Sequence, residues 1–396
     1  MELLAELRQI TLGLLWFQQH DDAVPAAERG DNLKFGLCAD EFAEEDHFPR
    51  QLYIREARRL VGRSRLIERS LVQVEPNGRP PLLRDAVAVG SFAIDSFPCT
   101  TGLPALEQRS GATAMEGYVG MNTALVAPST LPAAMMLPAS PHNLIVPTAV
   151  SASHVAFSAV RLEPTWMMLG SAAGLIAHLS LQGLALAPAE LDVARVRLVD
   201  TQRLIIAQGQ PLAYFSDLVV GDPGWQALQL IAPHAFEAAE GFAAQPAATL
   251  PRAMAVHWIA AALRAANSTL GRMAPSGALL PVPGSGKDWP DYHRNDTGFA
   301  EAAALAAAGA VTPAPGFGQA FQPHLPIALT EMQAWVRSAA ALLPEAPHNT
   351  RIKTLKSERP SRGDDDRATR AQAAALVVEA LLGGGLYTDL DMAAYQ

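Results

Sequence analysis

The sequence has 396 residues, of which 49% are hydrophobic and 17% charged. This balance supports two or three domains with sizeable cores and excludes wholesale disorder and a disulfide-stapled miniature. The 30 Lys and Arg residues are outnumbered by 39 Asp and Glu residues, and the net charge of −9 gives no electrostatic footprint for a nucleic-acid backbone. The two cysteines, Cys38 and Cys99, are too few for a thiolate metal cluster or a disulfide framework, although they leave room for one bridge.

The first segment has the spacing of an amphipathic helix. Its leucines and isoleucine recur three or four residues apart, at Leu3, Leu7, Ile10 and Leu14, so we expect it to pack on a core. The segment also lacks the basic-then-apolar order of a signal peptide. As written, the chain is therefore expected to carry no export signal.

Strand patterns appear in the middle of the chain. Residues 86–94 are β-branched and aromatic with partial alternation, and Asn143–Pro147 is a short apolar run of the kind found in buried strands. A helix is predicted to begin at Glu163 and Pro164, because proline suits the first turn. Its most apolar part, Trp166–Ala177, is shorter than the ~20 residues that cross a bilayer, so we predict a buried core helix and no membrane span.

The composition of the sequence changes near residue 208. Ala-rich helical stretches alternate there with Gly- and Pro-containing loops, which predicts one domain over residues 1–207 and a mostly helical region over 208–396. Two segments of this region resemble each other, and a third is a partial copy, as in a helical-hairpin repeat. The segments are Tyr214–Ala255, Asp296–Glu331 and Arg367–Leu376.

Two familiar site types are not supported. The loop Gly284-Ser-Gly-Lys287 resembles a phosphate loop, but Pro281 stands where the first glycine is needed and Asp288 where a Ser or Thr would bind magnesium. The ten histidines never fall at a zinc-ligand spacing, so no metal site is predicted. Gly170 and Gly174 are more informative, because glycines four residues apart lie on one helix face and allow close approach of another helix or of a ligand.

A family resemblance joins these features. The stretch from Asn143 to Gly174 resembles the C-terminal flavin-binding signature of FAD-dependent oxidoreductases of the type called xanthan lyase-like. Its carrying motifs are Ser151-Ala-Ser-His-Val-Ala-Phe-Ser158, Arg161-Leu-Glu-Pro164 and Met168-Leu-Gly-Ser-Ala-Ala-Gly174. Further motifs agree in order, namely Thr11-Leu-Gly-Leu-Leu15, Gly36-Leu-Cys-Ala-Asp-Glu-Phe42, Leu52-Tyr-Ile-Arg-Glu-Ala-Arg-Arg59, Gly90-Ser-Phe-Ala-Ile-Asp95 and Glu116-Gly-Tyr-Val119.

The resemblance implies an α/β (α+β) flavoprotein-like fold with FAD as cofactor. It covers the substrate-binding and flavin-closing portion, without the strand and Gly-x-Gly-x-x-Gly loop that hold the ADP half, so an N-terminally truncated enzyme is expected. The helix after Glu163 would direct its free amides at flavin oxygens. The implied cofactor-binding residues are Ser151, Ser153, His154, Arg161, Glu163, Pro164, Gly170, Ala173 and Gly174.

The resemblance leaves the catalytic residues open. The family's aspartate-x-histidine becomes Asp95-Ser-Phe97 here, which removes an imidazole that would serve as acid or base. Asp95 and Arg55 are the candidates; Arg55 belongs to a run with arginines 58, 59 and 63 that would bind an acidic substrate group or form a solvated face. His154 is otherwise a hydrogen-bonded loop residue, and Arg161 is otherwise paired with a carboxylate such as Glu163.

The helical region more loosely resembles surface-layer-homology modules, which attach proteins to cell-envelope polymers. The carrying motifs are Tyr214-Phe-Ser-Asp217 and Arg367-Ala-Thr-Arg370; a helical cap without a ligand is the other interpretation. Together the two resemblances predict an FAD-dependent oxidoreductase that transfers hydride between flavin and a small-molecule substrate. The alternative is a non-catalytic, envelope-associated binding protein that has lost the cofactor. A periplasmic or cell-envelope location is what family habit suggests.

Overall fold

The computed structural model describes residues 2–51, 53–73, 78–101, 115–116, 118–120, 127–182, 191–237, 240–266, 268–269, 289–343 and 366–382. The chain divides into two compact units, Met1–Arg58 and Arg59–Gln396. The glycine-rich loop Gly284–Lys287 lies outside the described residues.

The first unit consists of two helices and a 3-10 turn. Helices α1 (Glu2–His20) and α2 (Ala26–Asn32) pack on each other, and η1 (Ala43–Glu45) follows. The predicted first helix therefore forms, but within the first unit it packs on no core. No described residue of 2–58 is buried, and the apolar residues Leu3, Ile10 and Leu14 are 61%, 59% and 55% exposed. A two-helix unit of this length buries little apolar surface by itself.

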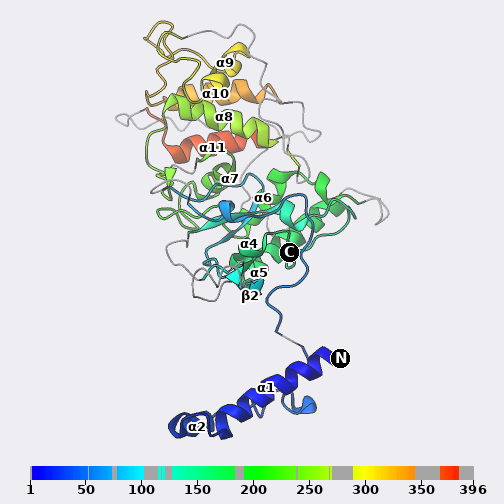
Figure 1. Cartoon of the computed structure of the whole chain (residues 1–396). Coiled ribbons are helices and arrows are strands. Elements are labelled where there is room, and N and C mark those ends of the chain that lie inside the picture. Colours follow the sequence, from blue (N-terminus) through cyan, green and yellow to red (C-terminus); the bar gives the residue numbers. More distant parts are fainter. Residues whose placement is uncertain are drawn as a thin grey trace. The chain divides into compact units, whose positions relative to one another are not determined.

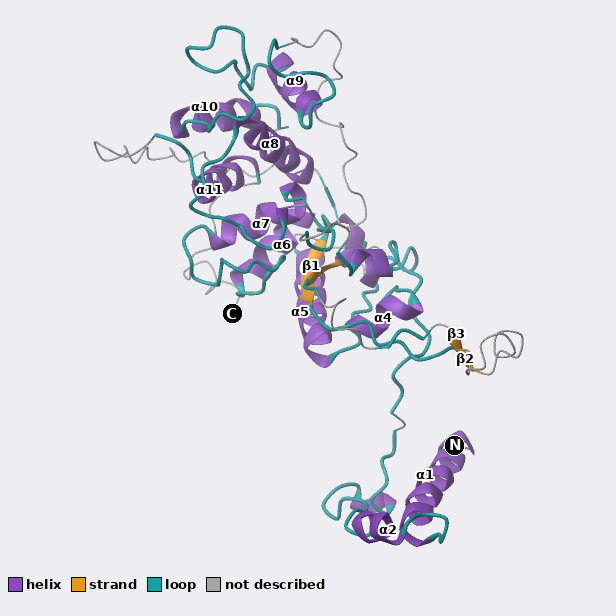
Figure 2. Ribbon diagram, turned by 60° about the vertical axis from the view of Figure 1, so that its left-hand side comes forward, coloured by secondary structure: helices purple, strands orange, loops and turns teal. Residues whose placement is uncertain are grey.

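The second unit opens with a small antiparallel sheet. After η2 (Glu68–Ser70), strand β1 (Ala86–Gly90) pairs with β4 (Ser129–Pro132), with a bulge between Ala86 and Ala88. The strands β2 (Thr100–Thr101) and β3 (Met115–Glu116) form a second antiparallel pair. Helices α5 and α6 both contact β1 (Figure 2), which explains why Ala86, Val87 and Ala88 are buried.

The second predicted strand is wrong. Residues 143–147 form a loop in which Val146 donates a single backbone hydrogen bond to the Met136 carbonyl oxygen, 2.9 Å away. Pro147 has no N–H to continue a ladder, and Asn143 and Leu144 are exposed. The first predicted strand is shorter than expected, since β1 ends at Gly90.

Helices carry the rest of the unit. The segment η4 (Ala133–Met136) leads to α4 (His154–Val160), α5 (Glu163–Leu181), η6 (Val193–Arg195) and α6 (Leu198–Ala207). Helices α7 (Trp225–Ala235), α8 (Arg252–Ala266), α9 (Phe299–Ala307), α10 (Leu329–Ala340) and α11 (Arg370–Leu381) follow (Figure 1). Thus the described chain is mixed helix and strand, and helices predominate after residue 208 as predicted.

Helix α5 begins where the sequence predicts, with Pro164 in its first turn. Its buried residues recur every three or four positions and so form one face: Thr165, Leu169, Ala172, Ile176 and Ser180. The predicted core helix therefore forms and is buried along one face, because this face meets β1 and α6 while Met167 is 75% exposed.

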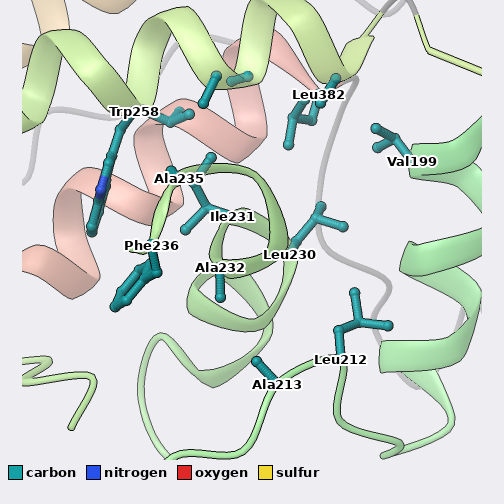
Figure 3. Packing of buried hydrophobic residues seen from close by; sticks show 14 of the residues in the cluster. Val199, Leu212, Ala213, Leu230, Ile231, Ala232, Ala235, Phe236, Trp258 and Leu382 are labelled. Carbon is teal, nitrogen blue, oxygen red and sulfur yellow. The ribbon is translucent and has the colours of Figure 1, made fainter. Parts of the chain in front are cut away.

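One hydrophobic cluster runs through the whole second unit. It extends from Leu66 to Leu382 and crosses the predicted boundary near residue 208. Figure 3 shows part of it, with Val199 from α6, Ile231 from α7 and Trp258 from α8. Helices α6 and α7 contact each other directly, so the residues on both sides of 208 share this core.

Buried polar contacts also cross residue 208. The Gln202 side-chain amide on α6 donates to the Arg84 and Ala86 carbonyl oxygens, 2.9 and 3.1 Å away, and its Oε1 lies 2.9 Å from Nε2 of His234 on α7. Arg79 lies between the rings of Phe215 and Phe242, 5.1 Å from each ring centre. Burial lowers the pKa of Arg79 to about 10, an effect that the charge of Glu240 opposes.

Matching turns precede helices α8 and α10. The Asp217 carboxylate accepts hydrogen bonds from the amides of Ala244 and Gln245, at 2.7 and 2.8 Å. Asp291 accepts from Phe321 and Gln322, both at 2.7 Å, and Gln245 and Gln322 share positive φ angles of 52° and 57°. The sequences on both sides therefore fold into the same aspartate-fastened turn.

Three segments meet in a closed ring of backbone hydrogen bonds. The Leu250 amide donates to the Ala368 carbonyl (3.0 Å), Ala368 to Ile327 (2.9 Å) and Ile327 to Leu250 (2.9 Å). Each of these residues stands two positions before the first residue of α8, α10 or α11. The three helices are thus joined in cyclic order at their N-termini.

Candidate functional site

The candidate site lies around helices α4 and α5. Ser153 caps α4 by accepting a hydrogen bond from the Ala156 amide at 3.0 Å, and its hydroxyl makes a short hydrogen bond to the carboxylate of Glu68. Ser151 holds the preceding turn through its backbone, donating to the Met135 carbonyl and accepting from the Leu66 amide, at 2.8 and 3.0 Å. These contacts position the segment that the sequence assigns to the cofactor.

The segment 95–97 is fastened to α4 by three polar contacts. His154 Nε2 lies 2.6 Å from the Phe97 carbonyl oxygen, and Arg161 Nη2 donates to the Asp95 carbonyl oxygen at 2.8 Å. The Asp95 amide in turn donates to the Ser158 hydroxyl at 2.9 Å. The guanidinium of Arg161 also stacks on the Phe97 ring, 5.3 Å from its centre. His154 and Arg161 are therefore used to hold this segment.

The two candidate catalytic residues lie in different units. Asp95 is half-buried in the second unit, and within the described residues its carboxylate has no hydrogen-bond or ion-pair partner. Arg55 belongs to the first unit, where its guanidinium stacks on the Tyr53 ring at 5.3 Å. Of the other arginines in that run, Arg59 donates to the Ala152 carbonyl at 3.1 Å, so it supports the turn before α4.

Helix α5 offers an open N-terminus and an open face. Glu163 and Pro164 are exposed, and the N-cap residue Leu162 provides no side-chain cap, so the first amides of a 19-residue helix lack a side-chain acceptor. A Cβ atom added at Gly170 or Gly174 would meet nothing within 4 Å. Ala173 lies beside Gly174 and is half-buried.

These glycines do not serve close packing against another helix of the described chain. If the glycines served a neighbouring helix within the described chain, an added Cβ would clash with it, as it does at Gly62. There a Cβ would lie 2.8 Å from Ser151 Cβ. The open face of α5 therefore leaves room for a group that the described residues do not supply, and the free amides of its first turn suit the oxygens of such a group.

Sequence reasoning missed Glu68 and Gly62. Glu68 is 85 residues from its partner Ser153, and Gly62 meets Ser151 across the fold. No local pattern marks either residue, because a lone acidic residue and a lone glycine are ordinary in a loop. A short hydrogen bond or a close backbone approach is visible only after folding.

A charged cluster between α8 and α9 lies apart from the predicted residues in sequence. His257 Nδ1 is 2.9 Å from Glu301 Oε2, and Arg264 donates to Glu301 Oε1 at 2.8 Å. Burial lowers the pKa of His257, but the hydrogen bond and charge of Glu301 outweigh it, so the pKa is raised. Burial likewise raises the pKa of Glu301, yet His257 and Arg264 bring it below its usual value. The Glu301 carboxylate thus binds two basic side chains of α8.

Buried arginines mark the starts of α8 and α11. Arg252 lies 5.0 Å from the Phe321 ring centre and 4.6 Å from that of Trp335, and it pairs with Glu331. Arg370 lies over Phe236 and Trp258, at 4.7 and 5.7 Å, and pairs with Glu240. Both arginines therefore join separate segments of the helical region internally.

The described ranges give no support for a metal site, a disulfide bond or a membrane-spanning helix. No group of three His, Cys, Asp or Glu side chains gathers there as metal ligands. Cys38 and Cys99 are both exposed and carry free thiols, in different units. No helix in these ranges combines the length and the hydropathy needed to cross a bilayer.

The family model of FAD dependent oxidoreductases matches residues 1–199, half of the 396-residue chain. This match spans α1, the small sheet, α4 and α5, and it ends at the start of α6. The chain therefore belongs to the FAD-dependent oxidoreductase family, whose cofactor is FAD. No curated protein matches the sequence.

Proposed function

We propose that the chain is an oxidoreductase that transfers hydride between a small-molecule substrate and FAD, with helix α5 contacting the flavin. The observation that carries this proposal is the open glycine face of α5 inside the family match. Bound FAD supplies the hydride chemistry itself. The protein supplies position and electrostatics.

In this proposal Gly170, Ala173 and Gly174 form the contact face, and the first turn of α5, which begins at Glu163 and Pro164, contributes the free amides of Glu163 and Thr165, since proline has no N–H. Four further residues would act mainly by supporting the segments around the cofactor: Ser151, Ser153, His154 and Arg161. Their polar contacts hold the turn before α4 and the segment 95–97 in place. Asp95 would face the substrate, since its carboxylate has no partner in the described part of the chain.

The domain division at residue 207 belongs to the same proposal. Residues 1–207 would form the oxidoreductase-like domain, and residues 208–396 a set of degenerate repeats. Support for repeats comes from the aspartate-fastened turns at Asp217 and Asp291 and from the hydrogen-bond ring of Leu250, Ile327 and Ala368. The shared core implies that the two parts fold together.

The repeats favour a second function for the helical region. Modules of the surface-layer-homology type would attach the protein to a cell-envelope polymer, in the periplasm or at the cell envelope. If the chain binds no flavin, this envelope-associated binding protein is the function that remains. A pull-down of the intact chain with purified envelope polymer tests it, and retention in the soluble fraction would contradict it.

The visible absorption spectrum of the purified chain, before and after addition of FAD, tests the main proposal. Flavin bands that stay with the protein through gel filtration are expected, and their position should shift relative to free FAD because the ring leaves water. Bands that elute only with free FAD would overturn the proposal.

A further inference from the structure

Two short extended segments of the second unit are joined next to α4. Ser96 and Val119 form an antiparallel bridge, in which the Ser96 amide donates to the Val119 carbonyl oxygen at 3.1 Å. The Val119 amide donates to the Ser96 hydroxyl at 2.8 Å. This pair fixes the register of the residues on either side of it.

The register places Phe97 opposite Tyr118. In an antiparallel pair, residues directly opposite each other project to the same side, and successive residues alternate. The burial follows this alternation: Ser96 is 1% exposed, whereas Phe97 is 43% and Tyr118 is 51% exposed. Val119 packs on the hydrophobic core. Two aromatic side chains therefore stand on the outer side of the bridge.

Asp95 and Gly120 occupy the next opposed positions on that outer side. A Cβ atom added at Gly120 would lie 2.9 Å from the Tyr118 hydroxyl, so the Tyr118 ring covers this glycine. The ring can occupy this position only because Gly120 has no side chain. Its hydroxyl end is thereby brought toward the position that faces Asp95. The outer side thus combines two aromatic rings with a carboxylate that has no partner among the described residues.

The charges around this surface are balanced. The Arg161 guanidinium stacks on Phe97 and donates to the Asp95 carbonyl oxygen. Its positive charge disfavours a cationic ligand, and the Asp95 carboxylate disfavours an anionic one. A neutral ligand avoids both penalties and still gains a hydrogen bond to the carboxylate.

We propose that Asp95, Phe97 and Tyr118 form a binding surface for a neutral, polyhydroxylated ring, the class to which simple sugars belong. The C–H face of such a ring packs on aromatic side chains, and its hydroxyl groups donate to a carboxylate. The surface would hold the substrate of the proposed oxidoreductase, so as a substrate site it rests on that function. Phe97, which stands where the family resemblance expects a histidine, would thereby have a role in binding.

The test measures binding of neutral methyl glycosides of glucose, galactose and mannose to the intact chain by saturation-transfer NMR and calorimetry. Glucuronate and glucosamine serve as anionic and cationic rings of similar shape. We expect at least one neutral glycoside to bind, and to bind at least fivefold more tightly than either charged ring. Absence of binding by every neutral glycoside, or preference for a charged ring, would overturn the inference.

Variants locate the binding on this surface. Tyr118→Ala and Phe97→Ala are each expected to weaken the neutral glycoside at least tenfold, while Tyr118→Phe keeps the ring and retains binding within about threefold. Phe317→Ala is the matched control, because Phe317 is an aromatic residue 50% exposed elsewhere in the unit. Equal binding by Tyr118→Ala, Tyr118→Phe and the control would contradict the assignment.

FAD titration of the same samples separates the two proposals. Glycoside binding without FAD binding would retain the surface and reject the oxidoreductase function. FAD binding without any glycoside binding would reject the surface alone.

Discussion

His234 Nε2 on α7 lies 2.9 Å from Gln202 Oε1 on α6, and through Gln202 it is connected to the β1 backbone. The histidine is 8% exposed. Burial, followed by the charges of Arg84 and Arg264, lowers the pKa of His234 to about 3 from 6.5. A neutral imidazole thus joins the family-matched part of the chain to the helical region.

This contact predicts a pH-dependent stability. As pH falls below 6.5, the unfolded chain takes up a proton on His234 while the folded chain does not, until the pH approaches 3. The free energy of unfolding therefore decreases by about 1.4 kcal/mol per pH unit in that window. Between pH 7 and 5, wild type is expected to lose about 2 kcal/mol more than His234→Gln in urea unfolding. His324→Gln, at an exposed histidine, should behave as wild type.

Arg252 predicts a large stability effect in the helical region. Arg252→Leu leaves the Glu331 carboxylate, whose side chain is 11% exposed, without its partner, so unfolding should become easier by about 3–5 kcal/mol. Leucine is chosen because Leu329 stands at the start of α10, as Arg252 does for α8. The double variant Arg252→Leu/Glu331→Gln should recover part of the loss. If chemical denaturation shows the single and double variants equally unstable, the ion pair has been misassigned; Arg337→Leu, on the exposed side of α10, is the control.

Gly62 predicts a steric effect at the candidate site. The Cβ of Gly62→Ala would approach Ser151 Cβ to 2.8 Å and the carbonyl oxygens of Ala134 and Met135 to 3.1 Å. We expect a loss of about 1–3 kcal/mol, since the backbone on both sides has to shift. Gly170→Ala has open space around it and should be neutral or stabilising by about 0.5–1 kcal/mol. Thermal unfolding of both variants distinguishes the two environments.

Glu301 controls the titration of His257. Without the Glu301 carboxylate, burial and the charge of Arg264 lower the pKa of His257 and only the charge of Glu237 raises it. Because burial is the largest effect, Glu301→Gln should bring the pKa below 6.5. In wild type the pKa is raised, and the stability that this shift contributes is present below 6.5 and lost as pH rises through the folded value. NMR titration of the imidazole measures the change. An unchanged His257 pKa in Glu301→Gln would refute the contact, and Glu379→Gln provides an exposed control.

The sequence predicted those parts of the site that local chemistry determines. Pro164 and the apolar spacing placed the start of α5 correctly, and Ser153 is a typical helix cap. The strand predicted at Asn143–Pro147 failed because an apolar run forms a strand only where a partner offers a ladder, and Val146 has a single bond to Met136. Whether an apolar face is covered, as α1 shows, also depends on distant residues.

The sequence also did not reveal that the polar candidate residues bind other segments of the same chain. His154 and Arg161 are predicted by the resemblance to lie at the cofactor, and the structure joins both to the segment 95–97. That connection spans more than fifty residues in the chain, which no local spacing reveals. Their direct contact with FAD remains a prediction.

We propose that the open face of α5 receives the flavin, and FAD titration of Gly174→Leu is the measurement that decides this. The new side chain meets nothing in the described chain close to its Cβ, so the fold should persist, as circular dichroism will verify. We expect FAD affinity, measured by flavin fluorescence quenching, to fall at least tenfold relative to wild type. Gly13→Leu, at a helix glycine of α1 with equally open surroundings, should retain wild-type affinity. Equal FAD affinity in Gly174→Leu and wild type would contradict the claim.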